Sequence, residues 1–109
     1  MQKHSVVIVN LHSPREKIWG VLLSVQNYGI TLRGIDLNSF DDWTREVSSG
    51  ETGIGLSTVM FPMHRVERVL LDEGVGDIQS LADVFQSRVG EDLWSHLNLS
   101  RPSEEDERL

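Results

Sequence analysis

The residues best suited to chemistry in this chain are Met63, His64 and Arg65, which stand between the apolar stretches STVMFP and VERVLL. An imidazole can hydrogen-bond to a nucleobase and a guanidinium can stack on one, so His64 and Arg65 are candidates for binding RNA. The simpler interpretation is a polar turn between two strands, because Pro62 lacks a backbone donor and should end the first of them. The sequence leaves both interpretations open.

A second candidate is the Gln26-Asn27-Tyr28-Gly29 stretch, in which Asn27 and Tyr28 could form a platform for stacking a base. The same four residues are typical of a hairpin turn, with Asn27 or Gly29 supplying a positive φ angle. Both interpretations place Asn27 and Tyr28 at the tip of a hairpin.

Other reactive residues lack the spacing that catalysis or metal binding needs. The paired acids at 41–42 and 72–73 are sequence neighbours, and no nucleophile accompanies them. The glycines at 50, 53 and 55 are followed by neither a helix nor the Lys-Ser/Thr of a phosphate loop. The chain has no cysteine, and its four histidines have no ligand spacing. We therefore predict a non-enzymatic protein with no catalytic residues, no cofactor and no metal.

Length and charge narrow the class of protein further. A chain of 109 residues with 39% apolar residues is expected to form one domain. The net charge is −7, and the acidity lies beyond residue 40, because residues 1–40 carry four Lys and Arg against two Asp and Glu. An acidic domain lacks the positive field that drives phosphate-backbone binding, which weakens the case for RNA. The first apolar run spans only four residues, so we expect a cytoplasmic protein without a membrane segment.

The pattern of apolar residues predicts five strands followed by a helix. The strands are expected at 5–12, 17–25, 29–37, 56–61 and 64–71, with a bulge near 33–34 and a close backbone approach or sharp bend at Gly20. Residues 38–55 are polar and rich in glycine, and they predict an extended connection. Ser80 and Asp83 form a capping box that begins a helix, which Gly90 ends.

The predicted architecture is therefore mostly β: a small, strongly bent, five-stranded antiparallel barrel with a C-terminal α-helix. Residues 1–76 form the barrel with its long loop at 38–55, residues 77–97 form a helical extension that lies on the barrel, and residues 98–109 form a disordered acidic tail. Trp43, in the long loop, is the tryptophan expected to contact a neighbouring molecule.

Two segments resemble those of Sm-like proteins, especially the bacterial Hfq branch. The first is Gly20-x-Leu22-x-x-Val25-Gln26-x-Tyr28-x-Ile30-x-Leu32, in which a strand glycine precedes alternating apolar residues and a turn. The second is Phe61-Pro62-Met63-His64-Arg65-Val66-Glu67-Arg68-Val69, in which one strand ends in a tight turn and the next begins. The resemblance covers residues 6–71, and His64 falls where Hfq carries a histidine.

The resemblance implies a homo-oligomeric ring in which the fourth strand of one subunit pairs with the fifth strand of the next. Val59, Phe61, Val66 and Val69 would then serve this interface, and Met63, His64 and Arg65 would line a central pore. It also implies weak RNA binding by Asn27, Tyr28, Met63, His64 and Arg65.

The chain departs from the Sm-like pattern in three ways. Its helix follows the strands instead of preceding them, its 38–55 connection is long, and Met63 replaces the lysine that precedes the Hfq histidine. The last departure weakens the case for RNA binding at this site, and the alternative function is a protein-protein assembly or adaptor module. In this alternative, an acidic Sm-like scaffold and its C-terminal helix recruit proteins and bind no RNA.

Overall fold

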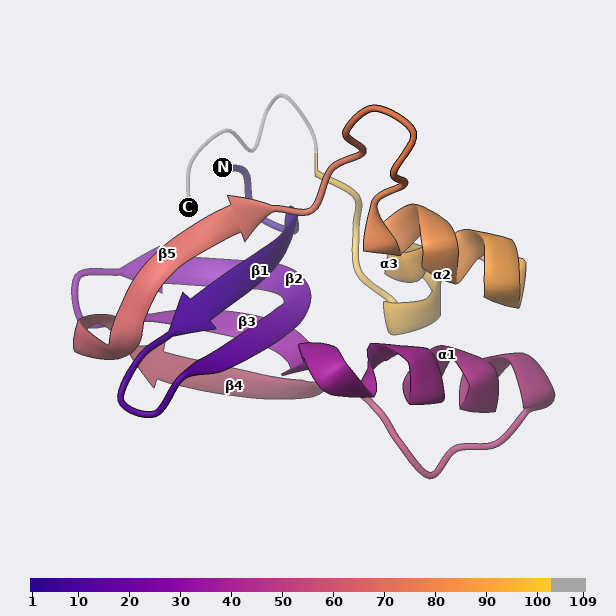
Figure 1. Cartoon of the computed structure of the whole chain (residues 1–109), viewed down its shortest axis with the longest axis horizontal. Helices are drawn as coiled ribbons and strands as arrows, with labels where there is room; N and C mark the ends of the chain where they lie inside the picture. Colours follow the sequence, from indigo (N-terminus) through magenta and orange to yellow (C-terminus); the bar gives the residue numbers. More distant parts are fainter. Residues whose placement is uncertain (103–109) are drawn as a thin grey trace.

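A computed structural model describes residues 1–102 and shows one antiparallel sheet with helices on one side (Figure 1). The strands are β1 (Val6–Leu11), β2 (Glu16–Gln26), β3 (Gly29–Asp36), β4 (Ser57–Pro62) and β5 (Val66–Leu71); the helices are α1 (Phe40–Ser49), α2 (Leu81–Val89) and α3 (Leu93–Leu97); and two short 3-10 turns are η1 (Leu37–Ser39) and η2 (Met63–Arg65). The strand order is β4-β3-β2-β1-β5. The mostly β, five-stranded antiparallel prediction is confirmed, whereas β4 and β5 lie at opposite edges and are not paired into a closed barrel.

Two details of the predicted strands are wrong. β5 begins at Val66 instead of His64, because residues 63–65 form η2. The predicted bulge at 33–34 lies instead in β2, where Leu22 pairs with Leu32 and Ser24 with the adjacent Thr31. A second irregularity lies in β5 and places Val66 and Val69 against the same core, although residues three apart in a regular strand point to opposite faces.

Gly20 makes the close backbone approach that its position in a strand predicts. It pairs with Gly34 of β3, and a Cβ atom at position 20 would overlap the Arg33 carbonyl group. A Cβ at Gly34 would lie 2.8 Å from the carbonyl oxygen of Trp19. Two glycines facing each other therefore allow β2 and β3 to approach closely where the sheet bends.

Each face of the sheet buries its own apolar cluster. The concave cluster consists of Val7, Val9, Leu11, Ile18, Leu22, Ile30, Leu32 and Phe61. The helix-side cluster consists of Val6, Trp19, Val21, Phe40, Trp43, Leu56, Phe85 and Leu93. Alternate residues of β1 enter the two clusters, which explains why its sequence is an uninterrupted apolar run instead of an alternating one.

The 38–55 connection is not an extended loop, because it contains α1. Phe40, Trp43 and Val47 recur at helical spacing and pack on the helix-side cluster, and Gly50 ends the helix with a φ of 83°. Trp43 is 1% exposed and stacks on Phe85 of α2, with ring centroids 4.8 Å apart. The expectation that Trp43 contacts a neighbouring molecule is therefore wrong.

The C-terminal helices form as predicted and lie on the sheet. The Ser80 side chain accepts a hydrogen bond from the Asp83 amide at the start of α2, and Gly90 ends the helix with a φ of 87°. Arg88 of α2 donates to Asp41 of α1 at 2.7 Å, and this hydrogen bond holds the pKa of the Asp41 carboxyl below its usual value. The hydrogen bond adds to the stacking of Trp43 on Phe85 as a contact between the two helices.

Residues 98–102 cross back over the amino-terminal segment. The Ser100 carbonyl lies 2.7 Å from the His4 ring, and the Arg101 guanidinium lies 5.0 Å from the Trp94 ring centroid. Trp94 in turn donates to the His4 carbonyl at 2.8 Å. Residues 98–102 of the predicted disordered tail therefore make defined contacts, and the rest of that prediction, residues 103–109, lies outside the described part of the chain.

Candidate functional site

The turn between β2 and β3 and the turn between β4 and β5 lie side by side. Gln26 pairs with Gly29, which leaves Asn27 and Tyr28 as a two-residue hairpin loop. The Met63 amide donates to the Tyr28 carbonyl at 2.9 Å and joins η2 to this loop. We call Asn27, Tyr28, Met63 and His64 the turn surface.

The β2–β3 turn exposes an aromatic ring without the backbone geometry that the sequence suggested. Tyr28 is 69% exposed. Neither Asn27 nor Gly29 has a positive φ angle. The glycine at position 29 is instead required for steric reasons, because a Cβ there would lie 2.6 Å from the Phe61 carbonyl oxygen. The glycine lets β4 approach the turn, and the Tyr28 ring remains free to stack on a ligand.

Arg65 does not belong to the turn surface, although it follows His64 directly. Its side chain donates to the His12 carbonyl at 3.3 Å and to the Pro14 carbonyl at 3.0 Å, and it lies 3.7 Å from the Glu16 carboxylate. Only 21% of the side chain is exposed. Arg65 therefore fixes the β1–β2 connection, and a base would have to replace these contacts to stack on it.

The four residues assigned to the oligomer interface lie on the two edge strands and face the concave cluster. Phe61 of β4 is buried within it, and Val59, Val66 and Val69 pack against it while partly exposed. Val66 and Val69 also line an open apolar depression of about 440 Å³ with Met63 and Met1. The concave core is thus incompletely covered near the turn surface.

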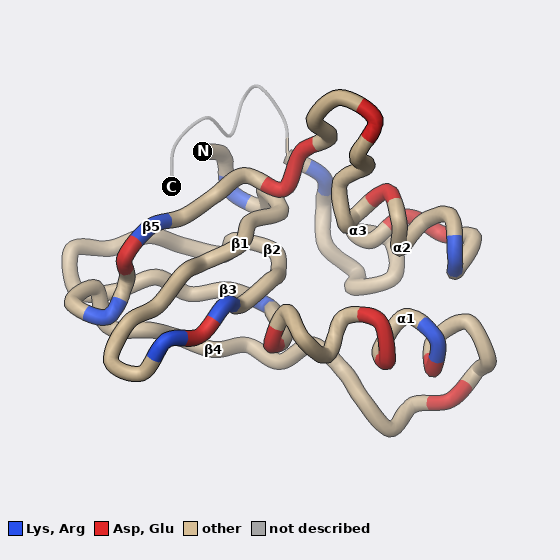
Figure 2. Tube along the Cα trace, viewed as in Figure 1, with Lys and Arg blue, Asp and Glu red and all other residues tan. Residues whose placement is uncertain are grey.

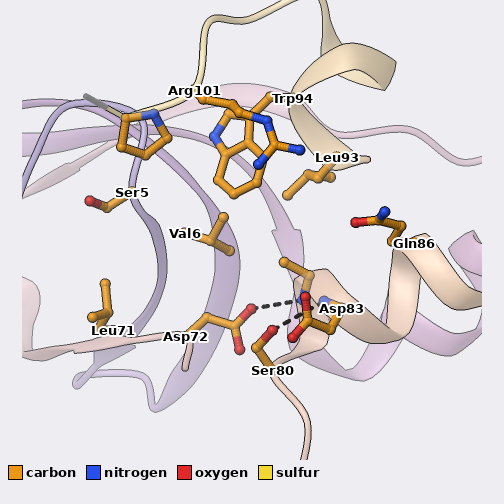
Figure 3. A pocket seen from close by; sticks show the side chains of 12 residues that line it. Ser5, Val6, Leu71, Asp72, Ser80, Asp83, Gln86, Leu93, Trp94 and Arg101 are labelled. Atoms are coloured by element: carbon orange, nitrogen blue, oxygen red, sulfur yellow. Dashed lines mark hydrogen bonds between the residues drawn. The ribbon is translucent and has the colours of Figure 1, made fainter. Parts of the chain in front are cut away.

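A depression of about 310 Å³ lies where β5 meets the helices (Figure 3). Asp72 stands in its wall and accepts hydrogen bonds from the Leu81 and Ala82 amides at 2.8 and 2.9 Å, and from the Trp19 indole at 3.2 Å. The carboxylate therefore caps α2 and fastens it to the sheet. We conclude that this depression is the junction at which Asp72 joins the sheet to α2. The sequence did not reveal it, because an aspartate after a strand is typical of a turn.

Residues 1–102 were compared with the requirements of a metal site and of a membrane-spanning helix. No group of three or more histidine, aspartate or glutamate side chains gathers there in a way that could hold a metal ion. None of the helices in this part of the chain is long and apolar enough to cross a bilayer.

The turn surface presents the exposed side chains of Tyr28, Asn27 and His64, an aromatic ring, an amide and an imidazole. It contains no Lys or Arg side chain, because Arg65 is engaged elsewhere. In comparisons with known proteins, no family model, curated protein or solved structure matches the chain.

Proposed function

We propose that this chain is a non-enzymatic, Sm-like protein that assembles into a homo-oligomeric ring. The observation that carries the proposal is the pair of open sheet edges: within residues 1–102, β4 pairs only with β3, and β5 only with β1. An unpaired edge presents a row of free backbone groups that another strand can satisfy. Both edge strands have six residues, so β4 of one copy matches β5 of the next in length.

The side chains on the two edges support the same assembly. Met60 of β4 is 48% exposed and Leu70 of β5 is 43% exposed, which leaves apolar surface on both strands. A β4–β5 contact between copies is heterologous, and such contacts form a ring when the rotation between copies closes. The neighbour would also cover Val59, Val66 and Val69 and thereby complete the concave core.

Lysine at the two exposed edge positions should separate the ring into monomers. In Met60→Lys/Leu70→Lys the fold is expected to persist, because both side chains are solvent-exposed, while each new charge opposes strand pairing. Light scattering and native mass spectrometry should give a multiple of the chain mass for the wild type and a single chain mass for the variant.

Ile78→Lys provides the matched control, since Ile78 is exposed on the connection that precedes α2 and lies on neither edge strand. It should retain the wild-type mass. A wild-type monomer at tens of micromolar, or an edge variant that keeps the wild-type mass with unchanged circular dichroism, would refute the ring.

The turn surface is the candidate ligand site of this ring, and single-stranded RNA is its proposed ligand. The exposed Tyr28 ring can stack on a base, and His64 is also exposed beside it. Because Arg65 is engaged by the β1–β2 connection, the proposed binding is weak.

Replacing Tyr28 should weaken RNA binding by about tenfold, since one base–aromatic stack contributes roughly 1–3 kcal/mol. Labelled oligo-U and oligo-A would be titrated at low and moderate salt against wild type, Tyr28→Ala and His64→Ala. Arg65→Lys is the comparison, because it keeps the charge without the planar guanidinium. No binding at low salt, or equal affinities for wild type, Tyr28→Ala and His64→Ala, would reject RNA as the ligand.

A second function, protein assembly without RNA, is favoured by the charge of the chain and by Arg65. The net charge of −7 opposes nucleic acid, and the only arginine in the predicted RNA site is bound to carbonyl oxygens. In this function the ring persists and the titration with RNA shows no binding.

A further inference from the structure

Asn10 is a polar residue inside the sheet, between two cations. It lies on β1, which is flanked by β2 and the edge strand β5, opposite Lys17 of β2 and opposite Arg68 of β5. Residues directly opposite in antiparallel strands project from the same face, and adjacent strands are about 4.8 Å apart. The Lys17 and Arg68 backbones therefore flank Asn10 at a separation of roughly 10 Å.

This row lies on the sheet face opposite the concave cluster, just past the helices. Val9 and Leu11, the neighbours of Asn10, point into the concave cluster, so Asn10 faces the other way. Two residues earlier, Ile8 of the same face packs against the helix-side cluster. The row thus begins where the helices stop covering the sheet, and it borders an open depression of about 370 Å³.

Asn10 itself is buried without a full set of partners. The residue is 6% exposed, and its Oδ1 atom is shut off from solvent without a hydrogen-bond partner among residues 1–102. Oδ1 is an acceptor, so an anion such as phosphate would not satisfy it, and only the amide nitrogen of Asn10 can serve as a donor. Because Asn10 also lines the depression, its amide nitrogen is the group available to donate to a ligand there.

The unpaired charges around the depression include one cation in excess, which favours an anion. Three carboxylates line it: Glu16 lies 3.7 Å from Arg65, whereas Asp36 and Glu67 make no ion pair within residues 1–102. The three cations that line it, Arg15, Lys17 and Arg68, make no ion pair within the described part of the chain. Figure 2 shows Lys and Arg positions on β5 and near the start of β2, next to acidic positions.

We propose that Asn10, Lys17, Arg68 and Arg15 bind a phosphate group, carried by a small phosphorylated molecule or by the backbone of a nucleic acid. An amide N–H and flanking Lys and Arg side chains are donors suited to phosphate oxygens, and charge-assisted hydrogen bonds are the strong ones. The anion would also relieve the repulsion among the unpaired cations. The site goes beyond the turn surface and uses none of its residues.

Phosphate binding at this site can be measured by NMR and calorimetry on the full chain. Inorganic phosphate, pyrophosphate, uridine monophosphate and uridine would each be titrated at low salt, and the side-chain amide signal of Asn10 would be followed. The three phosphorylated probes should shift this signal saturably, and uridine should not. In Lys17→Ala/Arg68→Ala the dissociation constant should rise about tenfold or more, which corresponds to roughly 1.4 kcal/mol or more.

Two variants make the result specific. Arg45→Ala removes one cation from the exposed surface of α1 and should leave the affinity unchanged. Asn10→Leu removes the amide at similar volume and should abolish saturable binding. Because Lys17 and Arg68 are exposed, their double variant still tests the site if Asn10→Leu does not fold.

A short oligo-U chain separates the two sources of phosphate. Tighter binding of oligo-U than of uridine monophosphate, unchanged in Tyr28→Ala, assigns the site to a nucleic-acid backbone, whereas equal affinities assign it to a small molecule. Titrations that do not saturate, or affinities equally lowered in Lys17→Ala/Arg68→Ala and Arg45→Ala, would overturn the proposal.

Discussion

Gly20→Ala is expected to destabilise the protein by more than about 4 kcal/mol, a loss that is exceptional for a single methyl group. The added Cβ would overlap the Arg33 carbonyl group and would lie 2.5 Å from the Gly34 Cα atom. These are backbone atoms of the paired strand β3, so no side-chain rotation can relieve the overlap. Since domains of this size have about 5–15 kcal/mol of stability in total, much of the chain should be unfolded.

Urea unfolding followed by circular dichroism measures this effect, with Gly55→Ala as the control. Gly55 has nothing within 4 Å of its added Cβ and does not have a left-handed φ. Its replacement should leave the free energy of unfolding within about 1 kcal/mol of the wild type, with a gain expected from the less flexible unfolded chain. Similar midpoints for the two variants would show that β2 and β3 are not in close contact at Gly20.

The strands could be predicted because their evidence is local. β-branched runs bounded by Gly, Pro and Asn predicted all five strands, and a glycine inside one of them predicted the close approach at Gly20. The partner glycine, Gly34, was instead interpreted as a bulge. Register across two strands depends on contacts that no single strand encodes, so the irregularity at Leu22 and Ser24 could not be located.

The helix α1 was missed because its polar residues outnumber its apolar ones. Phe40, Trp43 and Val47 have helical spacing, but the flanking serines and glycines favoured a loop. Stability comes instead from tertiary packing, in which Trp43 fills the space between Trp19 and Phe85. The partners of Trp43 lie 24 and 42 residues away, beyond the reach of a pattern.

Only part of the candidate site could be predicted, because some of its contacts join residues that are far apart in the sequence. The proximity of Tyr28 and Met63 follows from the pairing of β3 with β4. The role of Arg65 could not be predicted, because its partners are carbonyl oxygens of His12 and Pro14 in a distant turn. The sequence alone indicates only that Asn10 follows an apolar run in a strand. Its position between Lys17 and Arg68 depends on the register of three strands.

Asp72→Ala is expected to lower the free energy of unfolding by about 3 kcal/mol. The substitution removes the acceptor for three donors: the Leu81 and Ala82 amides and the Trp19 indole. Loss of a helix cap costs about 1 kcal/mol, and a part-buried donor left without a partner costs roughly 1–3 kcal/mol. Asp77→Ala is the matched control, since Asp77 is an exposed acid on the same connection between β5 and α2, and it should change stability by less than about 0.5 kcal/mol.

Hydrogen exchange can show that this loss arises at the junction instead of throughout the sheet. In Asp72→Ala the amides of Leu81 and Ala82 should exchange faster at denaturant concentrations where β1 and β2 remain protected, because the carboxylate that held the start of α2 is gone. Asp72→Asn should be intermediate, since its amide retains one acceptor oxygen for these donors. If Asp72→Ala and Asp77→Ala have the same stability and the same exchange at residues 81 and 82, Asp72 does not fasten α2 to the sheet. If only Asp72→Ala loses protection there, the helices are held to the sheet by one carboxylate at the end of β5, in addition to the apolar packing of Phe85 and Leu93.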